Sequence, residues 1–133
     1  MRRATRYGDG WMPYFRSPAA LARDVAALRP MMESAGRDPA SLRVGAVVFA
    51  CVHDDVAVAE QMVSDRLAAN YAGDYAAIVA RQAAAGPADR CVERVEQYLA
   101  AGADTVFFAA LAHDDYEEQN DERLADEVMA VLR

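Results

Sequence analysis

The stretch Leu42–Val52, LRVGAVVFACV, decides the fold of this chain. All of its residues except Arg43 are apolar or glycine, and no polar residue breaks the run from Val47 to Val52. Such a run is typical of a strand covered on both faces, as parallel strands are in α/β proteins. Pro39 before it and the polar triplet after it limit its length to that of a strand. The rest of the chain reads as helices laid against this strand and one or two neighbours.

Composition narrows the class of protein. The chain has 133 residues, which predicts one domain over 1–133 with a single core. A net charge of −7 leaves little basic surface for a phosphate backbone, so we expect no nucleic-acid partner. No signal peptide and no membrane span is predicted. Cys51 and Cys91 lie in apolar patterns, which indicates reduced core thiols in a cytoplasmic protein.

Before the central strand, the sequence predicts a helix, a strand and a second helix. The first helix covers Met1–Tyr7, a glycine turn follows, and an extended segment covers Trp11–Phe15. Ser17 and Pro18 form a typical helix start, with serine as the N-cap and proline in the first turn. This second helix should run to Gly36, with Pro30 kinking it or ending its first section early.

After the central strand, we expect three helices, one more strand and a final helix. Asp54 or Asp55 should cap the first of these helices. The others are predicted over Tyr75–Ala85 and from Gly86-Pro87 to Gly102, the latter with Val92, Val95 and Leu99 inward. The strand is Asp104–Ala110, and the last helix should bury these four residues: Leu124, Val128, Val131 and Leu132.

Strands alternating with helices build parallel sheets through right-handed crossovers. Only three strands are predicted, which is few for a doubly wound sheet and suits a segment of a (β/α)8 barrel, also called a TIM barrel. The predicted fold class is therefore α/β, a partial TIM barrel of about three βα units with extra helices.

A doubled His-Asp-Asp motif is the sharpest local feature. One copy, His53-Asp54-Asp55, follows the central strand, and the other, His113-Asp114-Asp115, follows the last strand. Both stand at carboxyl ends of strands, where TIM-barrel active sites form. A divalent metal site or an acid–base pair is one interpretation. The alternative, which we prefer, is that the aspartates cap helices and the histidines are solvated loop residues, because no recognised ligand spacing is present.

Three stretches together resemble the C-terminal part of the luciferase-like monooxygenases: Arg2–Phe15 (RRATRYGDGWMPYF), Ser17–Phe49 with its AGRDP turn, and Ala83–Phe108 with its AGAD segment. The family comprises flavin enzymes and enzymes that use the deazaflavin coenzyme F-420. The resemblance implies the last three βα units of a TIM barrel. It also implies FMN or coenzyme F-420 as the cofactor.

In the family, the segment equivalent to Gly8-Asp9-Gly10-Trp11 lines the flavin pocket, so the resemblance implies these four residues as cofactor-binding. The alternative is a glycine turn followed by a tryptophan in the core. No catalytic residue and no metal ligand is predicted. The strands that carry most of the flavin pocket in the family, and its phosphate-binding loop, have no counterpart in the sequence.

We therefore expect a C-terminal fragment of a luciferase-like flavin- or deazaflavin-dependent oxidoreductase that is inactive alone. Two alternatives are a non-catalytic oligomeric scaffold and a subunit that completes a barrel with a separate N-terminal chain. Outer strands cut from a barrel expose unpaired backbone groups, so a homo-oligomer, most simply a dimer, is expected for the chain by itself.

Overall fold

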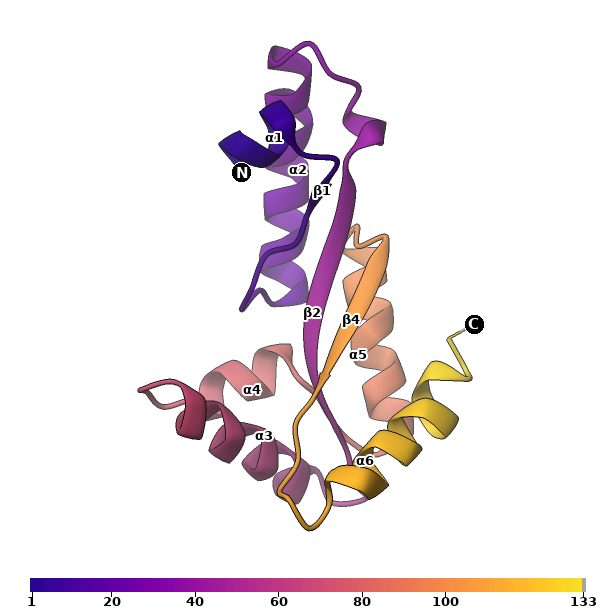
Figure 1. Cartoon of the computed structure of the whole chain (residues 1–133). Helices are drawn as coiled ribbons and strands as arrows, with labels where there is room; N and C mark the ends of the chain where they lie inside the picture. The colour runs from indigo at the N-terminus through magenta and orange to yellow at the C-terminus, as the bar shows by residue number, and fades with distance from the viewer. Residues whose placement is uncertain (133) are drawn as a thin grey trace. The chain divides into compact units, whose positions relative to one another are not determined.

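The central strand forms as predicted and organises the sheet. In the computed structural model, which describes residues 1–132, strand β2 covers Arg43–Val52 and is buried over most of its length. β1 (Gly10–Trp11) pairs with it in parallel at Arg43 and Val44. β3 (Ala84–Gly86) pairs in parallel with its last three residues, and β4 (Thr105–Ala110) also pairs with β2. Pairings among these residues leave the sheet open (Figure 1). The α/β class of a partial barrel is confirmed.

Two strand predictions need correction. The first strand was predicted over Trp11–Phe15 but ends at Trp11, because Pro13 lacks a backbone N–H and Phe15 turns the chain with a φ of 53°. One strand of the four, β3, was not predicted from the sequence. Its residues Ala84, Ala85 and Gly86 have no β-branched side chain, and pairing with β2 overrides their helical preference.

The chain divides into two compact units. Unit 1 consists of Met1–Val47 and Gln97–Phe107, and unit 2 consists of Val48–Glu96 and the chain from Phe108 onward. β2, β4 and α5 (Ala88–Ala100) each contribute residues to both units.

Unit 1 packs α1 (Arg2–Tyr7) and α2 (Pro18–Ser34) beside the start of β2. A short 3-10 helix, η1 (Pro39–Ser41), follows α2. The Ser17 Oγ accepts a hydrogen bond from the Ala20 N–H at 3.3 Å, as predicted for the N-cap. The α2 helix does not end at Pro30 but runs on to Ser34, whose Oγ donates to the Pro30 carbonyl at 2.7 Å.

Unit 2 contains α3 (Val56–Asn70), α4 (Ala76–Gln82), α6 (Glu117–Arg123) and a π-helical turn, η2 (Leu124–Met129). The Asp55 carboxylate caps α3 by accepting from the N–H groups of Ala57 and Val58 at 2.8 and 3.2 Å. α3 packs on α4 and β3. No helix within residues 1–132 is long and apolar enough to cross a membrane.

Two helix faces differ from the prediction. On α5, the buried residues are Cys91, Val95 and Tyr98, whereas Leu99 is 42% exposed. At the C-terminus, Leu124 and Val128 are buried as predicted, but Val131 is 66% exposed. The π-helical turn changes the rotation per residue, so a 3.6-residue pattern that fits Leu124 and Val128 fails beyond Met129.

Candidate functional site

The predicted cofactor segment Gly8–Trp11 is a turn between α1 and β1. Arg37, from the AGRDP segment, holds it in place. Its Nη1 donates to the carbonyls of Gly8, Thr5 and Ala4 at 2.8, 3.3 and 3.4 Å. These carbonyls belong to the last turn of α1, where a cation is favourable. Arg37 is therefore a positioning residue for this turn.

Three backbone groups of this turn are bonded within the protein. The Gly8 N–H donates to Ala4, the Gly8 carbonyl accepts from Arg37, and the Asp9 carbonyl accepts from the Arg43 N–H at 2.9 Å. The Asp9 carboxylate is exposed, with Arg37 Nη2 at 3.5 Å. The Asp9 carboxylate is a poor match for an anionic phosphate group.

Trp11 joins the core of unit 1. It packs, half-buried, against the buried cluster of Leu28, Met32 and Leu42. The buried side of Trp11 therefore agrees with the alternative that this tryptophan belongs to the core. The other side of Trp11 faces a cavity of about 320 Å3, whose lining comes from β1, β2 and β4. The residues that line it are Gly10, Trp11, Met12, Arg43, Val44, Gly45, Thr105 and Phe107.

This cavity stands at the lower end of the size range of ligand pockets, about 300 Å3. Its wall is mostly apolar, and Met12 and Phe107 are 55% and 50% exposed. Both side chains cover Gly45, where an added Cβ would come within 3.1 Å of Met12 Cγ and 3.2 Å of Phe107 Cε2. The hollow can hold an apolar ring edge, and none of its eight lining residues is a buried acid or base.

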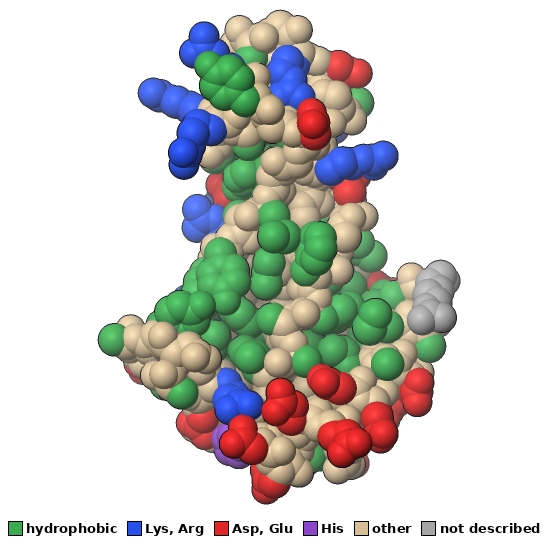
Figure 2. Space-filling view, in the orientation of Figure 1, with side chains coloured by type: hydrophobic (Ala, Val, Ile, Leu, Met, Phe, Trp, Pro, Cys, Tyr) green, Lys and Arg blue, Asp and Glu red, His purple; other side chains and the backbone are tan. Residues whose placement is uncertain are grey.

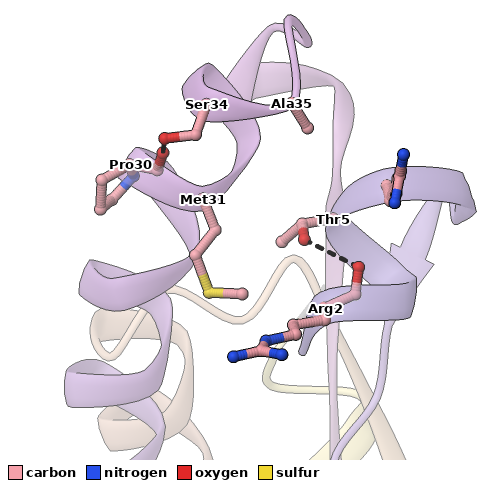
Figure 3. A pocket seen from close by; sticks show the side chains of 7 residues that line it. Arg2, Thr5, Pro30, Met31, Ser34 and Ala35 are labelled. Carbon is pink, nitrogen blue, oxygen red and sulfur yellow. Dashed lines mark hydrogen bonds between the residues drawn. The ribbon is translucent and has the colours of Figure 1, made fainter.

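A larger hollow, of about 620 Å3, lies between α1 and α2 (Figure 3). Arg2, Thr5 and Arg6 line it from α1, and Pro30, Met31 and Ser34 line it from α2, with Ala35 just beyond. The Thr5 Oγ1 donates to the Arg2 carbonyl at 3.1 Å, and the Ser34 hydroxyl is bonded within its own helix. The guanidinium groups of Arg2 and Arg6 are exposed, and that of Arg6 lies 5.5 Å from the centroid of the Tyr7 ring. This arrangement carries no catalytic group.

The first His-Asp-Asp segment is used for capping and pairing. The His53 Nδ1 accepts from the Asp55 N–H at 3.0 Å, and the His53 ring lies edge-on to Tyr116, 5.3 Å between centroids. Arg123 donates to Asp54 at 2.8 Å and to both carboxylate oxygens of Glu127 at 2.7 and 3.0 Å. The hydrogen bond from Arg123 keeps the pKa of Glu127 below its usual value.

The second segment makes contacts of its own with α3. The His113 Nε2 is 3.0 Å from Asp65 Oδ2 on α3, and Asp114 pairs with Arg66 at 2.8 Å. Across residues 1–132, no group of three or more His, Cys, Asp or Glu side chains is arranged to hold a metal ion. The Asp55 cap on α3 and these exposed pairs agree with the interpretation as cap and loop residues.

Both thiols are free, fully buried and inert. Burial raises the pKa of Cys51 to about 11 and that of Cys91 to about 12. The Cys91 Sγ donates to the Gly86 carbonyl at 3.4 Å. These thiols stay protonated at neutral pH, so neither is a nucleophile. The prediction of reduced core thiols is confirmed.

Three polar residues that sequence reasoning missed fix the backbone around the sheet. Besides Arg37, Asp104 accepts the Val44 N–H at 2.7 Å through its carboxylate and donates its own N–H to the Val44 carbonyl at 2.8 Å. Asn120, fully buried, accepts the Val52 N–H at 2.7 Å. Arg37 and Asp104 stand in the AGRDP and AGAD segments that carry the family resemblance, so these motifs secure strand ends rather than perform chemistry.

The sequence matches a known family, and the fold matches solved structures. The family model described as luciferase-like monooxygenase matches residues 1–77, more than half of the chain. A search of curated proteins finds no significant match. Among solved structures, the coenzyme F-420-dependent tetrahydromethanopterin reductase from Methanopyrus kandleri matches 99% of this chain with a TM-score of 0.73 and 16% identity.

Two further solved structures share this fold. An F-420-dependent secondary alcohol dehydrogenase, solved with an F-420–acetone adduct, matches 98% of the chain with a TM-score of 0.76 and 16% identity. A monooxygenase from Streptomyces bottropensis matches 99% with a TM-score of 0.67 and 16% identity. The chain covers 48%, 45% and 44% of the length of these three proteins, so it spans less than half of each. By its family match and its fold, the chain belongs to the luciferase-like monooxygenase family.

Proposed function

We propose that this chain forms the C-terminal part of the barrel of a luciferase-like oxidoreductase that uses FMN or coenzyme F-420, and that it does not turn over substrate alone. The observation that carries this proposal is the open sheet. Nearly the whole chain superimposes on less than half of three oxidoreductases, and its strands are not closed into a barrel.

The cofactor fit supports the second part of the proposal. In enzymes of this kind the flavin or deazaflavin supplies the redox chemistry, and the protein binds and orients it. In this chain, Arg37 bonds to the Gly8 carbonyl and pairs with the Asp9 carboxylate, and the Gly8 N–H bonds to α1. Trp11 and the apolar hollow beside it could contact one edge of a ring system. The chain alone would therefore bind either cofactor weakly.

We also propose that the protein works in the cytoplasm. Both cysteines are free and buried, which supports a reducing compartment.

The coding DNA on the 5′ side of the Met1 codon tests the proposal. We expect it to encode luciferase-like strands with a Gly-Gly-Ser-type loop, either in the same frame or in a neighbouring gene. Co-expression of that polypeptide with this chain should yield a complex of equal stoichiometry that binds FMN or coenzyme F-420 with a micromolar dissociation constant. If no such coding sequence exists, the proposal fails and the scaffold alternative is favoured.

The scaffold alternative has one specific observation in its favour. β4 carries the sequence TVFFAA, without a charge or a proline to discourage association. A chain that persists as an oligomer without cofactor would keep such an edge.

A further inference from the structure

One face of the sheet in unit 1 carries a hollow whose shape follows from the strands. Side chains alternate between the two faces of a strand, so Arg43 and Gly45 of β2 lie on the same face. Met12 and Phe107 lie there as well, because a Cβ added at Gly45 would come within 3.1 and 3.2 Å of their side chains. These residues line the cavity of about 320 Å3 on β1, β2 and β4, which we name the Gly45 hollow.

The position of the Gly45 hollow along the strands separates it from a TIM-barrel active site. Arg43 is the first residue of β2 and Thr105 is the first residue of β4, and both line the hollow. The hollow therefore stands at the amino ends of these strands, whereas active sites of TIM barrels form at the carboxyl ends. A ligand in the hollow lies away from the place where the proposed oxidoreductase chemistry is expected.

The wall of the hollow is largely apolar and open to solvent. Large hydrophobic side chains stand exposed on the surface of this chain (Figure 2), and Met12 and Phe107 are two of them. Because Gly45 has no side chain, both approach β2 closely and form one surface. A thioether and an aromatic ring make favourable contacts with a second aromatic ring. This surface therefore favours a flat apolar group.

Arg43 gives the hollow a positive charge. Of the lining residues, all within 1–132, it alone is charged. Its side chain is 80% exposed, and its ion pair with Asp104 is long, 3.5 Å from Nη1 to Oδ1. Asp104 lines a separate cavity beside α2, and its Oδ2 accepts from the Val44 N–H at 2.7 Å. Because a guanidinium has five N–H donors, Arg43 keeps donors for the carboxylate of a ligand.

We propose that the Gly45 hollow binds an aromatic carboxylate, with its ring on Met12 and Phe107 and its carboxylate on Arg43. Charge complementarity selects an anion, and the apolar wall selects a flat ring over a sugar or a phosphate chain. A cavity of about 320 Å3 suits a ligand of one or two rings. The inference rests on the hollow and not on the proposed oxidoreductase function, so either can fail without the other.

Titration of the purified chain with naphthoate, followed by NMR, tests the proposal. Trp11, the single tryptophan, lines the hollow and gives one indole N–H resonance as a reporter. We expect saturable shifts of this resonance and of the Gly45 and Phe107 amides, with a dissociation constant below about 1 mM for a ligand of this size. Naphthylmethanol, which has the same ring and no charge, should bind about fivefold to tenfold more weakly.

Two substitutions separate the contribution of the charge from that of the ring. Arg43→Met should weaken naphthoate binding about fivefold to tenfold and leave naphthylmethanol binding unchanged. Phe107→Ala should weaken the binding of both ligands, because both lose the ring contact. Arg23→Met is the matched control, since Arg23 is an exposed arginine on α2 away from the hollow, and its affinities should equal those of the natural chain.

Circular dichroism checks that each variant folds, and the comparison of the two ligands on the natural chain needs no variant at all. The proposal fails if naphthoate shows no saturable binding up to about 5 mM. Equal binding of the two ligands, full naphthoate affinity in folded Arg43→Met or Phe107→Ala, or shifts on α1 instead of the sheet would also overturn it. So would concentration-dependent shifts of Met12 and Phe107 without ligand, because a second copy would then cover this face.

Discussion

Arg37 determines where the Gly8–Trp11 turn lies, because it is the donor to three carbonyls at the end of α1. A hydrogen bond from a charged group contributes about 1.5–3 kcal/mol to stability. Because one nitrogen, Arg37 Nη1, serves all three carbonyls, we take this range for the three bonds together. We expect Arg37→Ala to lower the free energy of unfolding by about 2 kcal/mol. It should also shift the fluorescence of Trp11, the single tryptophan. Arg23→Ala, at an exposed site on α2, should change stability by less than about 0.5 kcal/mol.

The two histidines should contribute little to stability. His53 makes a local hydrogen bond and a ring contact with Tyr116, and His113 makes an exposed hydrogen bond with Asp65. His53→Ala and His113→Ala should each change the free energy of unfolding by about 0.5 kcal/mol or less. Thermal unfolding of both variants, with and without divalent cations, checks this. Stabilisation of the natural chain by a metal, lost in either variant, would revive the metal-site interpretation.

The buried thiols predict a pH dependence. Native Cys51 and Cys91 keep their protons up to a pKa of about 11 and about 12, above the ordinary value of 9.0. As pH rises through this window, the unfolded chain releases thiol protons that the native chain retains, so the free energy of unfolding falls. Replacing both cysteines with alanine should remove part of this fall, measured by urea unfolding between pH 8 and 11. An unchanged pH profile would contradict the assignment.

At the scale of elements, Asn120 joins α6 to the end of β2. Its side chain is fully buried, accepting from Val52 and donating to the Ala50 carbonyl at 3.4 Å. Asn120→Ala leaves the Val52 N–H buried without a partner, which costs about 1–3 kcal/mol. Chemical denaturation should show this loss. Asn70→Ala is the control, since Asn70 is exposed and bonds only to the Arg66 carbonyl of its own helix in the contacts described; a similar loss there would show that burial is not the cause.

Elements that depend on local sequence were predictable, and those that depend on distant contacts were not. β2, the Ser17 cap and the Asp55 cap follow from apolar runs and capping chemistry within a few residues. β3 is a strand only because β2 lies beside it. The same limit applies to the candidate site. The Gly8–Trp11 turn was found from its glycines, but Arg37, which bonds to it from 29 residues away, has no local signal.

At the scale of the whole molecule, the fold of the chain corresponds to part of a barrel wall. Its fold matches luciferase-like oxidoreductases over nearly its full length, and it covers less than half of theirs. A closed barrel protects every strand edge, whereas β4 has one unpaired side within residues 1–132.

Calorimetric titration of the purified chain with FMN and with coenzyme F-420 tests the central claim most directly, that this wall alone lacks a working cofactor site. The account predicts a colourless protein and dissociation constants no tighter than millimolar for both compounds. The reason is that the Gly8 and Asp9 carbonyls and the Gly8 N–H are already bonded to Arg37, Arg43 and α1. A micromolar dissociation constant for either compound, lost on Trp11→Ala, would contradict it.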